Sequence, residues 1–117
     1  MYKIIFYEDI NGKSEVFDYI KSLHECSDKN SKVNFAKIIA YLRVLSDRGT
    51  RAGDPFSKHI SGDIWELRPL KNRLFYAYCD KDTFIILHYF IKKTRKTPVG
   101  EIEKAKRNLK DYREREG

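Results

Sequence analysis

Three predicted strands in the most aromatic part of the chain carry the side chains best suited to chemistry. Glu66 and Arg68 alternate on the first strand, and Arg73 opens the second. His88 lies on the third, which runs on into Lys93 and further cations. The planar fork of arginine pairs with two phosphate oxygens at once, and glutamate, histidine or a lysine of lowered pKa can transfer protons. This set of residues indicates chemistry at a phosphate group.

RNA cleavage is a reaction that such a set can carry out, because the 2′-hydroxyl of the substrate is the nucleophile. The protein must deprotonate that hydroxyl, stabilise the charge on the pentavalent phosphorane and protonate the leaving 5′-oxygen. Aromatic rings can stack on bases that are splayed out. The candidate catalytic residues are Arg68, Arg73, Lys93, Glu66 and His88, and the candidate RNA-binding residues are Lys58, Tyr76, Phe90, Lys92, Arg95 and Lys96.

Each candidate also has a structural interpretation. An outward arginine on a strand commonly forms a cross-strand ion pair, and Glu66 suits such a pair at least as well as base catalysis. His88 stands in an otherwise apolar strand, where a core histidine with satisfied hydrogen bonds is the usual case. It stays a candidate because residues 84, 86, 88, 90 and 92 are expected to share one face of the sheet at a period of two.

Several common sites are absent from the sequence. There is no glycine-rich phosphate loop, no HExxH or CxxC motif and no serine in a nucleophile elbow. The histidines at positions 24, 59 and 88 do not have zinc-site spacing. We therefore expect no metal and no cofactor. Cys26 and Cys79 are interpreted as reduced thiols of a cytosolic protein, with a disulfide between them left open.

Length and charge narrow the class of protein. A chain of 117 residues predicts a single domain over residues 1–117. The net charge of +7, from 24 basic and 17 acidic residues, indicates an anionic partner, although a basic surface without such a partner stays the alternative. No apolar run approaches the roughly 20 residues of a membrane span, and the first residues lack the apolar region of a signal peptide. We expect a cytoplasmic protein that does not bind a membrane.

The remaining elements follow from periodicity and capping residues. A first strand is predicted near residues 2–8, and Ser14 can cap a helix that ends near Cys26. A second helix is predicted over residues 29–48 with Gly49 at its C-cap, and residues 49–62 are loop-like. Thr97 and Pro98 can begin a last amphipathic helix. The predicted fold is α+β, an antiparallel sheet of about four strands with an N-terminal helical hairpin and a C-terminal helix.

The motifs Trp65-Glu66-Leu67-Arg68, Arg73-Leu74-Phe75-Tyr76 and Leu87-His88-Tyr89-Phe90-Ile91-Lys92-Lys93, running to Pro98, resemble the RelE/ParE superfamily of bacterial toxins. The similarity is greatest to the phage-derived HigB-like branch and covers about residues 50–112. It implies a RelE-like fold and the toxin of a type II toxin–antitoxin pair. It also implies an endoribonuclease that cleaves mRNA on the ribosome, contacts 16S rRNA and is neutralised by a helix-turn-helix antitoxin.

The resemblance also assigns roles to particular residues. Arg73 matches the arginine that stabilises the phosphate in the family, and Lys93 falls near a second family cation. A C-terminal tyrosine used by some relatives has no counterpart at Val99, and Tyr112 lies too far along the last helix to replace it. The ParE branch shares the fold but inhibits gyrase. A gyrase inhibitor and a non-enzymatic binding module are therefore the alternative functions.

Overall fold

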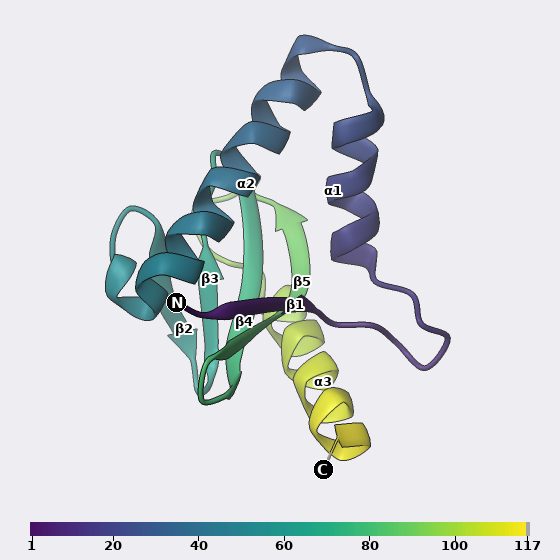
Figure 1. Ribbon diagram of the computed structural model, residues 1–117, viewed down its shortest axis with the longest axis vertical. Helices are drawn as coiled ribbons and strands as arrows, with labels where there is room; N and C mark the ends of the chain where they lie inside the picture. Colours follow the sequence, from purple (N-terminus) through teal and green to yellow (C-terminus); the bar gives the residue numbers. More distant parts are fainter. Residues whose placement is uncertain (117) are drawn as a thin grey trace.

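The structure, a computed structural model, describes residues 1–116 as one sheet with helices on both faces (Figure 1). The strands are β1 (Lys3–Phe6), β2 (Ser57–Ser61), β3 (Ile64–Leu67), β4 (Asn72–Asp80) and β5 (Thr83–Ile91). The helices are α1 (Glu15–Glu25), α2 (Lys29–Arg48) and α3 (Val99–Glu116), with a 3-10 turn, η1 (Gly49–Ala52), after α2. This element order confirms the predicted α+β class.

The sheet has five strands in the order β1-β5-β4-β3-β2, one strand more than expected. The extra strand, β2, lies in the stretch predicted as loop, because its sequence SKHIS has no clear apolar alternation. β1 pairs with β5 in parallel, whereas the other neighbours are antiparallel, so the sheet is mixed. Strand direction at this edge depends on how the helices return the chain, which local sequence does not encode.

The helices begin and end close to the predicted residues. The Ser14 side chain accepts a hydrogen bond from the Phe17 amide at the start of α1, and Gly49 ends α2 with a φ of 61°. α3 begins at Val99, one residue after the predicted start at Pro98. The Pro98 carbonyl accepts hydrogen bonds from the Glu101 and Ile102 amides, so Pro98 takes the position that precedes the helix. Within residues 1–116 no helix is both long and apolar enough to cross a membrane.

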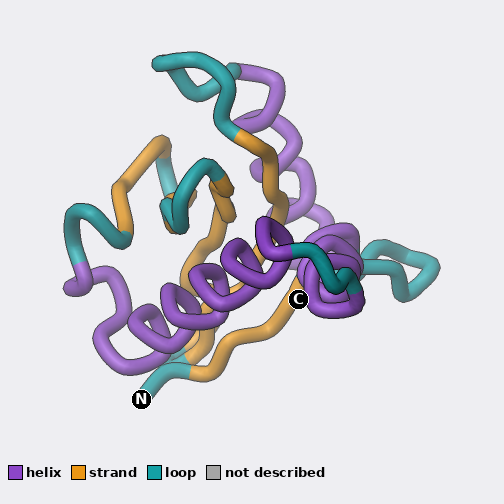
Figure 2. Tube along the Cα trace, turned by 90° about the horizontal axis from the view of Figure 1, so that it is seen from above, coloured by secondary structure: helices purple, strands orange, loops and turns teal. Residues whose placement is uncertain are grey.

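The two faces of the sheet carry separate apolar cores. The α1–α2 hairpin packs on one face against residues such as Leu67, Tyr76 and Ile86, and α3 packs on the other against Ile64, Phe75 and others. Seen from above, α3 lies on the opposite side of the strands from α2 (Figure 2). The helical hairpin therefore covers one face, as predicted. α3 crosses only part of the other face, which leaves room there for polar side chains.

A β-bulge in β5 reverses the predicted orientation of part of that strand. Phe75 pairs with His88 but the next residue, Tyr76, pairs with Ile86, so Leu87 is the extra residue. Phe84 and Ile86 face the hairpin, whereas His88 and Phe90 face α3. The expectation that residues 84, 86, 88, 90 and 92 share one face is therefore wrong. A single inserted residue changes the phase of a period-two pattern, and the apolar sequence around Leu87 gives no sign of it.

The His88 side chain links three elements, β5, α1 and α3, and we call this set of contacts the His88 clamp. Its Nδ1 contacts Glu15 Oε1 at the start of α1, and its Nε2 lies 2.8 Å from Glu101 Oε1 near the start of α3. Lys104 Nζ lies 3.3 Å from the other Glu15 oxygen. The histidine is 4% exposed, and both of its ring nitrogens face carboxylates. The contacts tie α1 and α3 to β5 beyond the point where β1 ends.

We predict that His88→Ala lowers the free energy of unfolding by about 2–3 kcal/mol, because two hydrogen bonds to carboxylates are lost inside the fold. The measurement is urea unfolding followed by circular dichroism. The matched control is His59→Ala, which removes an exposed histidine whose Nε2 contacts the Gly62 carbonyl at 2.7 Å. Equal stability of the two variants would contradict the clamp.

Candidate functional site

The candidate site lies on the α3-facing side of the sheet, beyond the stretch that α3 covers. Cross-strand pairing places Lys58, Glu66, Phe75 and His88 in one row across β2, β3, β4 and β5. A second row follows, in which Arg73 pairs with Phe90, and Arg68 comes directly after the Leu67–Leu74 pair. Paired residues project to the same face, so the antiparallel register brings together charges from separate strands.

Glu66 is the centre of this cluster and is only 2% exposed. Its Oε1 lies 3.5 Å from Arg68 Nε and 3.9 Å from Arg73 Nε. Arg68 reaches outward as well, with Nη1 at 3.8 Å from the exposed carboxylate of Asp54. Arg73 is held by Nη1 hydrogen bonds to the Leu70 and Asn72 carbonyls, at 2.7 and 2.9 Å. The Arg73 guanidinium is thus positioned by backbone rather than by the glutamate.

Three buried atoms of this cluster have no hydrogen-bond partner: Glu66 Oε2, Arg68 Nε and Arg73 Nε. The separations between Glu66 and the two arginines are longer than ordinary charge-assisted hydrogen bonds. Buried polar groups are nearly always paired, and an unpaired one calls for an explanation such as a ligand or a catalytic role. The cluster therefore has unused donors and an unused acceptor facing each other, as a binding site for a polar substrate would.

Burial changes the pKa values of Glu66 and Arg73. Loss of solvent raises the pKa of the Glu66 carboxyl above its usual range, and the nearby charges of Arg73, Arg68, Lys92 and Lys58 act in the opposite direction. Burial also lowers the pKa of the Arg73 guanidinium, against the stabilising charge of Glu66. Arginine stays protonated even so. Glu66 is thus a more basic carboxylate than an exposed one, beside permanent cations.

The predicted cations of the β5–α3 connection surround the same end of the sheet. Lys92 is half-buried, and its effect on Glu66 places its charge near the cluster. Lys92 and Lys93 line an open bay of about 880 Å³ together with Lys71 and Arg95. Lys96 is exposed but does not line the bay, and Lys58 is an exposed residue of β2 across from Glu66. The charges of Lys92 and Lys58 therefore act on the buried cluster, and Lys92 also lines the basic bay.

Tyr76 does not lie where the sequence suggested. The ring is fully buried on the opposite face of the sheet, in the core beneath the hairpin. Its hydroxyl contacts Ser57 Oγ at 2.5 Å, and burial raises the pKa of the phenol to about 12. Tyr76 is therefore a core residue and not a stacking platform for RNA bases. A tyrosine in an apolar strand such as β4 is compatible with either a core position or an exposed site. The sequence did not show which of the two applies, because it does not give the burial of the side chain.

Phe90 and His88 are on the expected side but are not free. Phe90 is 8% exposed and packs against Phe75, with ring centroids 5.5 Å apart. It forms an apolar wall of the site and offers no exposed ring face to a base. Both nitrogens of His88 are occupied by Glu15 and Glu101. These two carboxylates were not singled out in the sequence, because they are distant in the chain and meet His88 only in the folded state.

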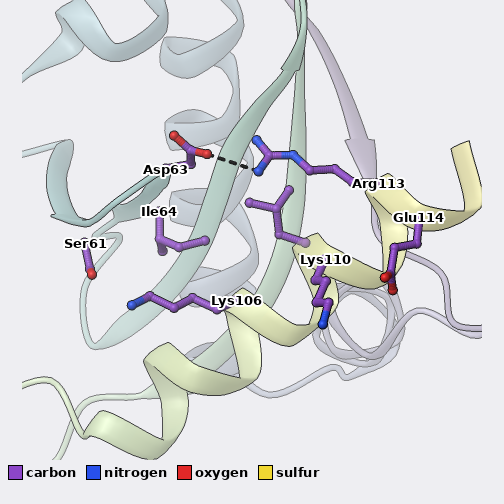
Figure 3. Close-up of a pocket in the computed structure, with 8 residues that line it drawn as sticks. Ser61, Asp63, Ile64, Lys106, Lys110, Arg113 and Glu114 are labelled. Carbon is purple, nitrogen blue, oxygen red and sulfur yellow. Dashed lines mark ion pairs between the residues drawn. The ribbon is translucent and has the colours of Figure 1, made fainter. Parts of the chain in front are cut away.

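A second basic feature is a groove of about 410 Å³ between the β2–β3 turn and α3 (Figure 3). Ile64 and Leu109 supply apolar lining. Lys106 reaches from α3 toward the side of Ser61 and Ile64 (Figure 3). Arg113 Nη1 is paired with Asp63 Oδ2 at 3.1 Å. The lining charges belong to surface side chains, and none of them is a buried unpaired group. This groove can attract an anion but does not resemble the Glu66 cluster chemically.

No group of three or more histidine, cysteine, aspartate or glutamate side chains in residues 1–116 is arranged to hold a metal ion. Cys26 and Cys79 are free thiols. The groups that the candidate site itself contributes are the Glu66 carboxylate and the guanidinium groups of Arg68 and Arg73. A buried carboxylate of raised pKa can take a proton, and two arginines with free donors can bind an anionic oxygen.

The comparisons with known proteins agree with this fold. The structure is similar to that of the YoeB–YefM complex from Staphylococcus aureus, with a TM-score of 0.57 and 16% sequence identity over 80% of this chain and 99% of the other. This similarity confirms the predicted RelE-like fold. No curated protein sequence matches the chain. A family model described as phage-derived protein Gp49-like (DUF891) matches residues 21–110, which include every candidate site residue. The chain belongs to the Gp49-like family of phage-derived proteins.

Proposed function

We propose that this protein is the toxin of a type II toxin–antitoxin pair and cleaves mRNA on the ribosome. The observation that carries the proposal is the buried Glu66, set between two arginines with its Oε2 and both arginine Nε atoms unpaired. The resemblance of the surrounding strands to RelE-type toxins points to the same reaction. The similarity to a structure solved as a complex of YoeB with YefM supports a protein partner for this chain.

In the proposed reaction Glu66 is the general base. Its carboxylate takes the proton of the 2′-hydroxyl, and the resulting oxygen attacks the adjacent phosphorus. The phosphorane that forms carries additional negative charge, which Arg73 and Arg68 stabilise through their free N–H donors. The backbone hydrogen bonds to Arg73 hold its guanidinium in place before the substrate arrives, so little reorganisation is needed during the reaction.

The leaving 5′-oxygen needs a cation or a proton donor. His88 is bound on both sides, so we assign this task to the lysines where β5 ends. Lys92 directly follows β5 and its charge acts on Glu66, and Lys93 is the next residue along the basic bay. The remaining cations, Lys58, Arg95 and Lys96, would attract the phosphates of mRNA and 16S rRNA. Bases would be held by the ribosome, since neither Tyr76 nor Phe90 offers a free ring.

Arg73→Ala is expected to reduce mRNA cleavage by about 10²–10³-fold, the usual loss when one donor to a developing oxyanion is removed. Cleavage is measured by primer extension on ribosomes programmed with a defined message, and growth arrest on expression gives a second measure. Arg107→Ala, an exposed arginine of α3, is the matched control. If folded Arg73→Ala protein still arrests growth while the message stays intact, gyrase supercoiling assays test the ParE-like alternative.

The proposed base predicts the pH dependence of the cleavage step. A base must be deprotonated, so the single-turnover rate should fall as pH falls through the pKa of Glu66. Burial raises that pKa, so the loss should occur closer to neutral pH than for an exposed glutamate. Glu66→Gln should lose about 10²–10⁴-fold in rate and the acid limb with it. The control is Asp54→Asn, and an unchanged pH profile in Glu66→Gln would exclude Glu66 as the base.

Lys93 and Lys96 should have separable effects. Lys93 lines the bay beside Lys92, whereas Lys96 lies outside it. Lys93→Ala should lower the single-turnover rate even at saturating ribosome concentration. Lys96→Ala should weaken ribosome binding, reduce its dependence on salt, and regain the full rate at saturation. The assignment fails if saturation restores the Lys93 variant, or if it leaves the Lys96 variant slow.

A further inference from the structure

An apolar groove lies on the face of the molecule opposite the Glu66 cluster. It has a volume of about 370 Å³ and is lined by residues of β1, α1 and α2. Its lining residues are Ile4, Phe6, Phe17, Ile20, Lys21, His24, Phe35, Ile39 and Leu42. The surface inside is apolar, although the residues belong to three separate elements.

The walls of the groove are two helical stripes that do not close on each other. Phe17, Ile20 and His24 repeat at helical spacing along α1, and Phe35, Ile39 and Leu42 do so along α2. The Phe6 and Phe17 rings meet edge to face, with their centroids 5.8 Å apart, and the ring centroids of His24 and Phe35 are 4.6 Å apart. Phe17 is nevertheless 52% exposed. Apolar surface of this kind, gathered in one hollow, is typical of a docking site for another apolar segment.

The edge of the sheet beside the groove is also unoccupied by any strand of residues 1–116. β1 is the last strand of the sheet and pairs only with β5. The amides of Lys3 and Tyr7 bond to the Asp82 and Ile86 carbonyls. Alternation along a strand then turns the backbone groups of Ile4 and Phe6 away from β5, beside the apolar hollow. An extended segment could gain hydrogen bonds from β1 and place side chains in the groove.

The charges at the groove favour an acidic occupant. Lys21 is a cation in the lining, no acidic side chain lines the hollow, and Lys3 of β1 is exposed. The whole chain carries a net charge of +7, so a partner with acidic flanks would approach faster and be held in one orientation. A second copy of this basic chain would be repelled. The chemistry that fits is an apolar segment flanked by aspartate or glutamate.

We propose that this groove binds an extended, acidic-flanked segment of the antitoxin, on the face away from Glu66 and Arg73. The proposal rests on the proposed function for the existence of an antitoxin, but it concerns a separate surface. Because the sheet lies between the groove and the cluster, this segment by itself leaves the catalytic face uncovered. Loss of groove binding should therefore weaken antitoxin binding without altering the cleavage chemistry.

The test uses overlapping peptides that tile the small protein encoded beside the gene for this chain. Binding of each peptide is measured by fluorescence anisotropy, and the bound surface is mapped by amide chemical shifts of the labelled full-length protein. We expect one acidic, apolar tile to bind, with the largest shifts at Ile4, Phe17 and Ile39. Phe17→Ser should weaken its binding by at least tenfold, and Val99→Ser, which removes another exposed apolar side chain, should leave it unchanged.

Because Phe17 is half-exposed, its replacement should preserve the fold. Phe17→Ser should cleave mRNA at the wild-type rate and bind the full-length antitoxin more weakly. Ile39→Asp provides a second variant in the opposite wall. Wild-type affinity in both folded variants, shifts confined to the Glu66 face, or the absence of any binding tile would overturn the proposal. Failure of the proposed function is distinguishable, since a protein that binds the tile at the groove but cleaves no mRNA contradicts only the catalytic assignment.

Discussion

A carboxylate buried against two arginines, without hydrogen bonds to either, is the interaction on which the candidate site depends. Glu66 is almost fully buried and is 3.5 and 3.9 Å from the nearest arginine nitrogens. Such a group destabilises the folded state unless its neighbours compensate for lost water. Its raised pKa has a definite consequence for stability. The contribution is most favourable at low pH, where the carboxyl is protonated, and is lost as pH rises through the folded pKa.

That cost is tolerable because the rest of the fold holds the cluster rigidly. Glu66, Arg73 and Phe90 project from three neighbouring strands, so their relative positions are fixed by backbone pairing. The carbonyls of Leu70, in the β3–β4 turn, and Asn72, at the start of β4, accept hydrogen bonds from the Arg73 guanidinium. The His88 clamp fastens α1 and α3 to the strand that leads into Lys92. The backbone contacts of Arg73 thus hold its guanidinium beside Glu66, which a flexible basic tail could not do.

The sheet also separates two kinds of surface. The α3 side combines buried charge with an exposed basic bay, which suits a polyanion such as RNA. The hairpin side combines a closed core with the apolar groove beside β1, which suits an apolar segment of a protein. If both proposals hold, substrate and antitoxin contact different faces, and inhibition through the groove would have to act on the shared strands or add further contacts.

The sequence by itself determined four of the five strands, the three helices with their approximate ends, and the identity of the central charges. Helical periodicity and the caps Ser14 and Gly49 act locally, so α1 and α2 were predicted closely. The alternation of Trp65 to Arg68 and the short turn to Arg73 were enough to bring Glu66 and the two arginines together.

Tertiary structure decided what depends on pairing between distant segments. The weakly patterned β2 became a strand because β3 offered an edge, and β1 became parallel to β5 because of the path of the chain. The bulge at Leu87 turned His88 toward Glu15 and Glu101, and burial removed Tyr76 from the site. Strand register and burial are properties of the whole packed sheet, and a period-two pattern reads the same whichever face is covered.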